Sequence, residues 1–153
     1  MKKTAPLMVA LPVAVLALIL AAKDHAYAGA SACKLCHKAE FQGRQYAIWE
    51  SSLHAKSLAS LASGNAAEIG KSVGVANPAK NAQCLGCHAP LAGAAPELKA
   101  EGVTCEVCHG PGSAYKKLSI MQDRDKAAQN GLIIYRDPGA IQAHCLKCHQ
   151  SPH

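Results

Sequence analysis

Cys105-Glu106-Val107-Cys108-His109 is one of four copies of a single pattern, Cys-x-x-Cys-His, in this chain of 153 residues. The other copies are Cys33-Lys34-Leu35-Cys36-His37, Cys84-Leu85-Gly86-Cys87-His88 and Cys145-Leu146-Lys147-Cys148-His149. All eight cysteines of the sequence belong to these copies, and a histidine follows the second cysteine of each one. The four copies therefore decide how the chain can fold and what it can bind.

The pattern is typical of the covalent attachment of c-type haem. The two thiols of each copy would bond to one haem, through Cys33, Cys36, Cys84, Cys87, Cys105, Cys108, Cys145 and Cys148. The adjacent imidazole would bind the iron from the proximal side, as His37, His88, His109 and His149. Zinc sites or disulfides could also use eight cysteines, but neither needs a histidine after every second cysteine. The sequence thus predicts four haem c groups.

The amino terminus has the organisation of a secretory signal. Lys2 and Lys3 precede an apolar run over residues 6–22, and Ala26-Tyr27-Ala28 offers a cleavage site with small residues. We predict that residues 1–28 are a signal peptide and that the protein acts in the periplasm or outside the cell. An uncleaved anchor is the alternative, since the apolar run is barely long enough to span a bilayer. After cleavage we expect no stable membrane span.

Residues 29–153 are expected to form one tetrahaem cytochrome c domain. The whole chain has one Trp, one Phe and four Tyr, so its own side chains can build only a small core. We predict a mainly α fold with extensive loops and little or no sheet, whose core is formed by the four haems. Without haem such a chain should be close to unfolded, because little apolar surface offsets its conformational entropy. The formal charge of +6 ignores the haem propionates and does not indicate a nucleic acid partner.

Periodicity and turn signals predict three helical regions. Gln42, Tyr46, Trp49 and Leu53 recur at helical spacing within residues 42–61, and His54 begins the adjoining stripe. Residues 64–81 are rich in Gly, Ala and Asn and are predicted to be loop and short turns. A second helix is expected over residues 113–129. Residues 132–135 are a short apolar run that either resembles a strand or lines a haem pocket.

The third predicted helix carries the last motif. Asp137 and Pro138 fit an N-cap followed by proline at the first helical position. Only 16 residues separate His88 from Cys105, so we also expect the second and third motifs to be neighbours. The sequence Gly110-Pro111-Gly112 should end any helix that carries the third motif.

Four irons need eight axial ligands, and four of these are the proximal histidines. Cleavage after Ala28 would leave three further histidines as candidate distal ligands: His54, His144 and His153. One iron would then lack a histidine. Three explanations stay open: an open or water-bound haem, a thioether ligand from Met121, or retention of His25 through cleavage nearer Ala22.

The chain resembles the small periplasmic tetrahaem cytochromes c typified by the electron acceptor of hydroxylamine oxidoreductase in nitrifying bacteria. The shared features are Trp49 and His54-Ala55-Lys56 after the first motif, Asn77-Pro78-Ala79-Lys80 before the second, and residues 102–112 around the third. The resemblance implies haems that stack in closely spaced pairs. It also implies that the haem on Cys84, Cys87 and His88 lacks a strong sixth ligand. The family has a distal histidine shortly after the third motif, where this sequence has Met121 instead.

The predicted function is electron transfer between a redox donor and a redox acceptor protein. One alternative is a haem enzyme that reduces a small nitrogen oxide or peroxide at an open haem. The chain offers few proton donors for such chemistry once its histidines are used as ligands. A second alternative is a subunit that self-associates into a polymeric haem wire, with the terminal His153 serving an adjacent subunit.

Overall fold

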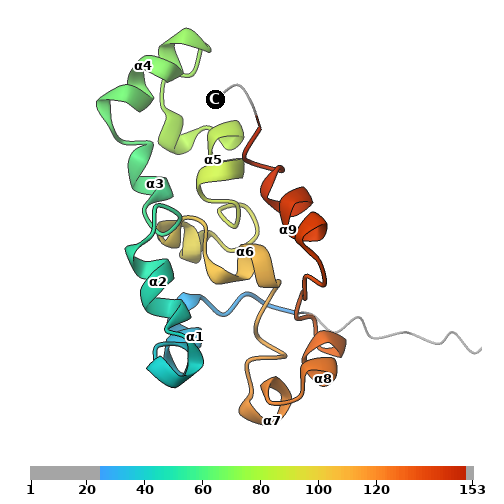
Figure 1. The fold of residues 1–153 in the computed structure, drawn as a ribbon. Helices are drawn as coiled ribbons and strands as arrows, with labels where there is room; N and C mark the ends of the chain where they lie inside the picture. The colour runs from blue at the N-terminus through green and yellow to red at the C-terminus, as the bar shows by residue number, and fades with distance from the viewer. Residues whose placement is uncertain (1–24, 151–153) are drawn as a thin grey trace, which may run out of the picture.

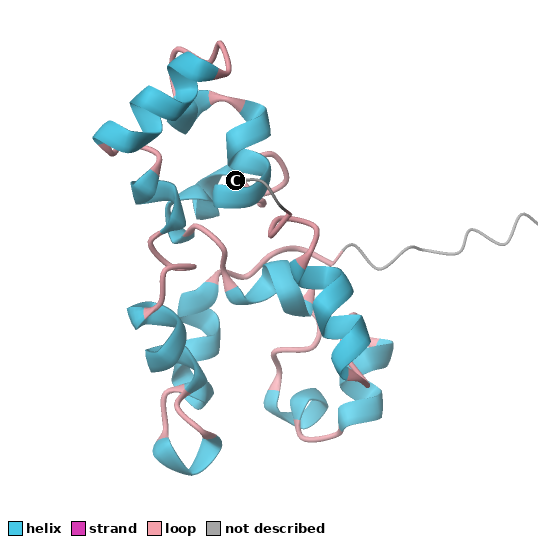
Figure 2. Cartoon of the chain, turned by 45° about the horizontal axis from the view of Figure 1, so that its top comes forward, coloured by secondary structure: helices cyan, strands magenta, loops and turns pink. Residues whose placement is uncertain are grey.

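The computed structural model describes residues 25–150, while residues 1–24 and 151–153 lie outside the described part. Within residues 25–150 all regular structure is helical, and loops join the helices (Figure 2). The elements are, in chain order, α1 (Ala30–His37), η1 (Glu40–Gln42), α2 (Gln45–Ser51), α3 (Ser57–Ser60), α4 (Gly64–Ser72), η2 (Pro78–Lys80), α5 (Ala82–His88), η3 (Pro96–Glu101), α6 (Cys105–His109), α7 (Leu118–Met121), α8 (Arg124–Gln129) and α9 (Pro138–Cys145). The predicted fold class, mainly α with extensive loops, is confirmed.

The short helices are arranged around α5 and α6. Figure 1 shows α1 to α4 along one side of the molecule, α5 and α6 in the middle, and α9 on the opposite side. Helices α7 and α8 pack against each other below α9, and the segment that precedes α1 runs beneath α6. None of the helices in the described part has the length and apolar character needed to cross a bilayer.

The chain's own apolar core is small. Its buried apolar residues are Ala30, Leu61, Ala89, Leu91, Ala95, Tyr115 and Ala127. Four of these seven are alanines, whose burial contributes little because it removes little apolar surface from water. Larger apolar side chains lie outside, with Phe41 87% and Leu53 85% exposed. The described side chains alone therefore provide little hydrophobic stabilisation, as the composition predicted.

The predicted helix over residues 42–61 is wrong as a single element. Gly43 and Arg44 both have left-handed backbone, with φ of 86° and 55°, and this turn separates η1 from α2. The helix α2 then ends where Ser52 is extended. Because of these breaks, the stripe from Gln42 to Leu53 does not form one face. Trp49 nevertheless points inward, and its indole nitrogen donates to the carbonyl oxygen of Val103 at 2.9 Å.

The prediction of loop and short turns over residues 64–81 is wrong for residues 64–72 and confirmed for residues 73–81. Residues Gly64–Ser72 form α4, which at nine residues is the longest helix of the described part. Ser63 caps this helix, because its side chain accepts a hydrogen bond from the Ala66 nitrogen at 3.3 Å. The high glycine content hid this signal. Gly70 packs so closely that a Cβ there would lie 2.6 Å from the carbonyl oxygen of Val75.

In the last third of the chain, the capping and turn residues predict the helix boundaries better than they do earlier in the chain. The predicted helix over residues 113–129 is wrong over residues 113–117, which form turns, and the rest is divided into α7 and α8. Asp123 starts the second of these helices by accepting from the Lys126 nitrogen at 3.0 Å. Gly110 and Gly131 have φ of 76° and 100° and end the preceding helical segments. The start of α9 is confirmed, because Asp137 accepts from the Ala140 nitrogen at 2.8 Å and proline follows it.

Candidate haem-binding site

Each motif lies on a helical turn. The first and second end α1 and α5, the third forms the whole of α6, and the fourth begins at the end of α9. On a helix, residues at positions i, i+3 and i+4 share one face. The two cysteines and the histidine of a motif have this spacing, so one turn presents both thiols and the imidazole in the same direction. All eight thiols are free of disulfides.

Thiols from different motifs meet in pairs. Cys33 of the first motif is hydrogen-bonded to Cys105 of the third, and Cys87 of the second to Cys148 of the fourth. The hydrogen bond with Cys33 lowers the pKa of the Cys105 thiol to about 7. These contacts pair the first motif with the third and the second with the fourth. The second and third motifs, which the short link between them led us to expect as neighbours, are joined through Ser57, whose hydroxyl bonds to the His88 carbonyl and to the Val103 nitrogen.

The third and fourth motifs also lie near each other. The pKa of the Cys108 thiol is raised by burial and by the nearby thiol of Cys145. Cys108 belongs to the third motif and Cys145 to the fourth, so these two motifs are also neighbours.

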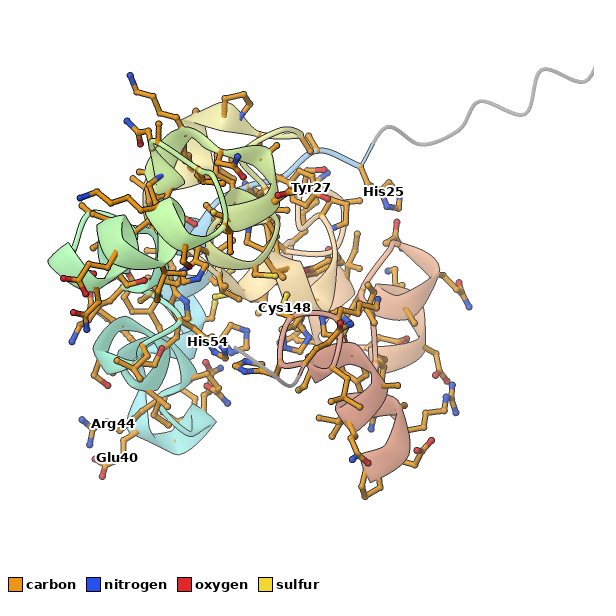
Figure 3. The ribbon with its side chains drawn as sticks, turned by 90° about the horizontal axis from the view of Figure 1, so that it is seen from above. His25, Tyr27, Glu40, Arg44, His54 and Cys148 are labelled. Atoms are coloured by element: carbon orange, nitrogen blue, oxygen red, sulfur yellow. The ribbon has the colours of Figure 1, made fainter. Side chains whose placement is uncertain are left out.

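His54 faces the histidine of the fourth motif. The ring centroids of His54 and His149 are 5.9 Å apart, and the ring planes are inclined by 60°. Figure 3 shows His54 near the middle of the molecule, close to Cys148. Two imidazoles on opposite sides of one metal, each with a metal–nitrogen bond of about 2 Å and about 1 Å from nitrogen to ring centre, have centroids about 6 Å apart. The two imidazoles lie close enough together that both could hold one haem iron.

Two proximal histidines are oriented through Nδ1. The Nδ1 of His88 lies 2.9 Å from the carbonyl oxygen of Ser57 and 3.1 Å from the hydroxyl of Ser60. The Nδ1 of His109 lies 3.4 Å from the carbonyl oxygen of Ile133. An imidazole that donates from Nδ1 to a carbonyl keeps Nε2 unprotonated and available to a metal. The second and third motifs thus have their histidines in the form that haem iron requires.

His144 lies beside the third motif. Its ring meets that of Tyr135 edge-on, with centroids 5.3 Å apart, and the Tyr135 hydroxyl donates to the carbonyl oxygen of Cys108 at 2.9 Å. The extended residues 132–135 run along this motif, because the Ile133 nitrogen also donates to the His109 carbonyl at 3.0 Å. Of the two predictions for residues 132–135, the structure supports the lining of the haem site.

The other candidate ligands lie apart from these pairs. Met121 is half-buried at the end of α7, a helix that packs on α8. The ring of His25 packs on Gly131, the glycine that ends α8. His153 is outside the described residues.

The segment before the third motif connects His54 to the site. The Val103 nitrogen lies 3.0 Å from the His54 carbonyl oxygen and 3.1 Å from the Ser57 hydroxyl. That hydroxyl is also 2.7 Å from the carbonyl oxygens of both His54 and His88. Gly102 makes this approach possible, with φ of 64° and no room for a Cβ. Sequence reasoning missed Ser57, since a lone serine after a histidine carries no recognisable signal.

Two carboxylates connect the first and third motifs. Helix α1 has Gly29 at its N-cap position and no capping side chain of its own. Glu101 accepts from the Ala30 nitrogen at 2.9 Å, and Glu106 accepts from the Gly29 nitrogen at 2.8 Å. Carboxylates also interact favourably with the positive end of a helix. Sequence reasoning treated Glu106 as a spacer between two cysteines and missed this role.

These observations fit haem c as the bound group. Thiols and imidazoles share one face in each motif, the imidazoles of His88 and His109 are held through Nδ1, and the ring of His54 lies beside that of His149. The fold and site define a multihaem c-type cytochrome, an electron-transfer protein that binds haem c.

Comparisons with known proteins agree with this class. A family model described as "Cytochrome c554 and c-prime" matches residues 32–110, and the chain belongs to this family. Cytochrome c-554 from Nitrosomonas europaea is 33% identical over 150 residues, an alignment that covers 84% of this chain and 59% of the relative. The chain thus spans about three fifths of the length of that relative. The search of solved structures found no match.

Proposed function

We propose that the protein carries four haem c groups, one on each motif, and relays electrons between a donor and an acceptor redox protein. Bound haem iron supplies the chemistry by cycling between its ferrous and ferric states. The observation that carries the proposal is the proximity of the motifs: Cys33 lies beside Cys105 and Cys87 beside Cys148, and Tyr135 joins Cys108 of the third motif to His144 next to the fourth. Because each thiol would anchor a haem edge, these contacts would keep successive redox centres adjacent.

The axial ligands follow from the same neighbours. We assign His54 as the distal ligand at the fourth motif, opposite His149, because the two rings face each other. We assign His144 to the third motif, because it packs on Tyr135 beside Cys108. The second motif, with His88, is the proposed site of an iron without a strong sixth ligand, as the family resemblance implies. His37, His88, His109 and His149 would be the proximal ligands.

The redox partners would dock only transiently. Electron-transfer encounters use small and weak interfaces, which allow rapid exchange of partners. A secretory signal at the amino terminus would place the protein in the periplasm or outside the cell, where c-type haem is attached. The donor and the acceptor are therefore expected among the secreted or membrane-exposed redox proteins.

Reductive titration of the purified holoprotein tests the proposal. We expect four electrons to be taken up per chain and returned to an added redox protein. Uptake of fewer electrons by fully haem-loaded protein would contradict the four-centre relay. A second arm adds nitric oxide to the ferric and the reduced protein and follows EPR spectra. A haem that binds nitric oxide, together with turnover of a nitrogen oxide or peroxide, would favour the enzyme; binding without turnover agrees with a relay that has an open iron.

A further inference from the structure

The residues just before α1 pack onto the third motif. Ala26 and Ser113 exchange two hydrogen bonds: the Ala26 nitrogen donates to the Ser113 hydroxyl at 2.9 Å, and the Ser113 nitrogen donates to the Ala26 carbonyl at 3.1 Å. One residue earlier, the ring of His25 covers Gly131 so closely that no side chain could replace the glycine there. Figure 3 shows His25 and Tyr27 where the chain enters the fold. We call residues 25–28 the N-terminal strap.

The strap also supplies partners to a buried charge. The side chain of Glu106 is only 2% exposed. Its carboxylate accepts from the backbone nitrogens of Ala28 at 2.9 Å, Gly29 at 2.8 Å and Gly112 at 2.6 Å. A buried carboxylate is tolerated only when hydrogen bonds or opposite charges compensate its lost hydration. Ala28 of the strap is therefore one of the three residues whose backbone amides satisfy Glu106.

Cleavage after Ala28, which the sequence predicts, would remove all of these strap contacts. Glu106 would lose the Ala28 donor and keep the Gly29 nitrogen, then the terminal amine, and the Gly112 nitrogen. Ser113 would lose both of its bonds to Ala26. When a buried polar group loses its hydrogen-bond partner, the free energy of unfolding falls by more than the hydrogen bond itself contributes to it. The Ala-x-Ala pattern predicts cleavage after Ala28, whereas the contacts of the strap favour a mature chain that keeps residues 25–28.

We propose that the mature protein keeps the N-terminal strap and that signal peptidase cuts upstream of His25, beside the small residues Ala21 and Ala22. The step is hydrolysis of one peptide bond. Water supplies the hydroxyl of the new carboxylate and the hydrogen of the new amine, so no oxidant or reductant is needed. The strap then holds the first motif against the third, with Glu106 as the positioning residue.

This position of the amino terminus changes the count of ligands. All eight histidines of the sequence lie at or after residue 25, so the mature chain would keep every one of them. The number of histidines would then equal the eight axial positions of four irons. The inference itself does not depend on the number of haems, because the strap contacts involve only the chain.

Amino-terminal sequencing of the holoprotein secreted by a host that attaches c-type haem tests the inference directly. A mature chain that begins before His25, with the signal removed, is the expected result. A chain that begins at Gly29 overturns the inference, and so does an uncut chain that begins at Met1.

A second experiment tests whether the strap matters to the fold. Foreign signal peptides with defined cleavage sites would produce holoproteins that begin at Lys23 or at Gly29. We expect the shorter chain to melt several degrees lower. Ser113→Ala should lower the melting temperature of the longer chain only, since its hydroxyl bonds to Ala26. Equal melting of the two chains, or an equal effect of Ser113→Ala in both, would contradict the role of the strap.

A third experiment tests the role of the Glu106 carboxylate in the chain that begins at Lys23. Glu106→Gln should lower its melting temperature, because an amide cannot accept on both sides as the carboxylate does. Glu97→Gln is the matched control, since Glu97 is exposed in the first turn of η3. If both variants melt alike, Glu106 does not hold the strap.

Discussion

The imidazole of His54 faces the imidazole of His149, with ring centroids 5.9 Å apart. His54 lies in the turn after α2 and His149 in the last motif, so this relationship joins two segments that are far apart in the sequence. Both side chains are exposed to solvent unless a group lies between them. A haem iron held by both rings would explain why two distant segments present histidines to each other.

We predict that His54→Ala converts one of the low-spin irons to high spin. Loss of an axial imidazole leaves five ligands, and the potential of that haem should rise because axial ligand identity sets the potential. EPR of the ferric holoprotein measures the change. Lys56→Ala, at an exposed position in the same turn, should leave the spectrum unchanged. If His54→Ala also leaves it unchanged, His54 is not an axial ligand.

Gly102→Ala is expected to destabilise the protein by about 2–4 kcal/mol. The added Cβ would lie 2.5 Å from the Ser57 hydroxyl and 2.7 Å from the His54 carbonyl oxygen, at a φ of 64° that alanine disfavours. Denaturant unfolding of the holoprotein gives the free energy. Gly93→Ala is the matched control, because nothing lies within 4 Å of a Cβ at that position. Comparable losses in the two variants would refute the close approach at Gly102.

The buried phenol of Tyr115 should make stability fall at alkaline pH. Burial raises its pKa, and its hydroxyl donates to the Gly110 carbonyl at 2.8 Å. Because the folded pKa lies above the unfolded value of about 10, this contribution is complete below pH about 10 and is lost as the pH rises further. Melting temperatures across this range should fall less steeply for Tyr115→Phe than for the native chain. A Tyr115→Phe profile parallel to the native one would contradict the prediction.

Local signals in the sequence predicted those parts of the fold that depend on neighbouring residues. The Asp137-Pro138 start of α9 and the break after the third motif were confirmed, because an N-cap and a left-handed glycine act within one turn. Helix α4 was missed because its Ser63 cap lies in a segment whose glycines indicated loops. The continuous helix over residues 42–61 was wrong because apolar spacing does not reveal the left-handed turn at Gly43 and Arg44.

For the candidate site too, the sequence predicted the local features and missed those that depend on tertiary contacts. The haem-binding motifs are contiguous in sequence and were recognised from it, whereas the opposition of His54 to His149 and the contact of Cys33 with Cys105 depend on tertiary packing. Glu106 is the most informative omission. It stands at a variable position of the motif, yet its carboxylate accepts from the backbone amides of Ala28 and Gly29 in a distant segment and of Gly112 just after the motif. An acidic residue between the cysteines, next to a helix that lacks its own cap, is the signal that could have found it.

The mass of the intact, denatured holoprotein tests the central claim most directly, because thioether bonds keep haem c on the unfolded chain. The account predicts the mass of the mature polypeptide plus four haems, falling to three when both cysteines of one motif are replaced by serine. A mass with fewer haems on the native chain, or a polypeptide without covalent haem, would contradict the assignment of one haem c to each motif.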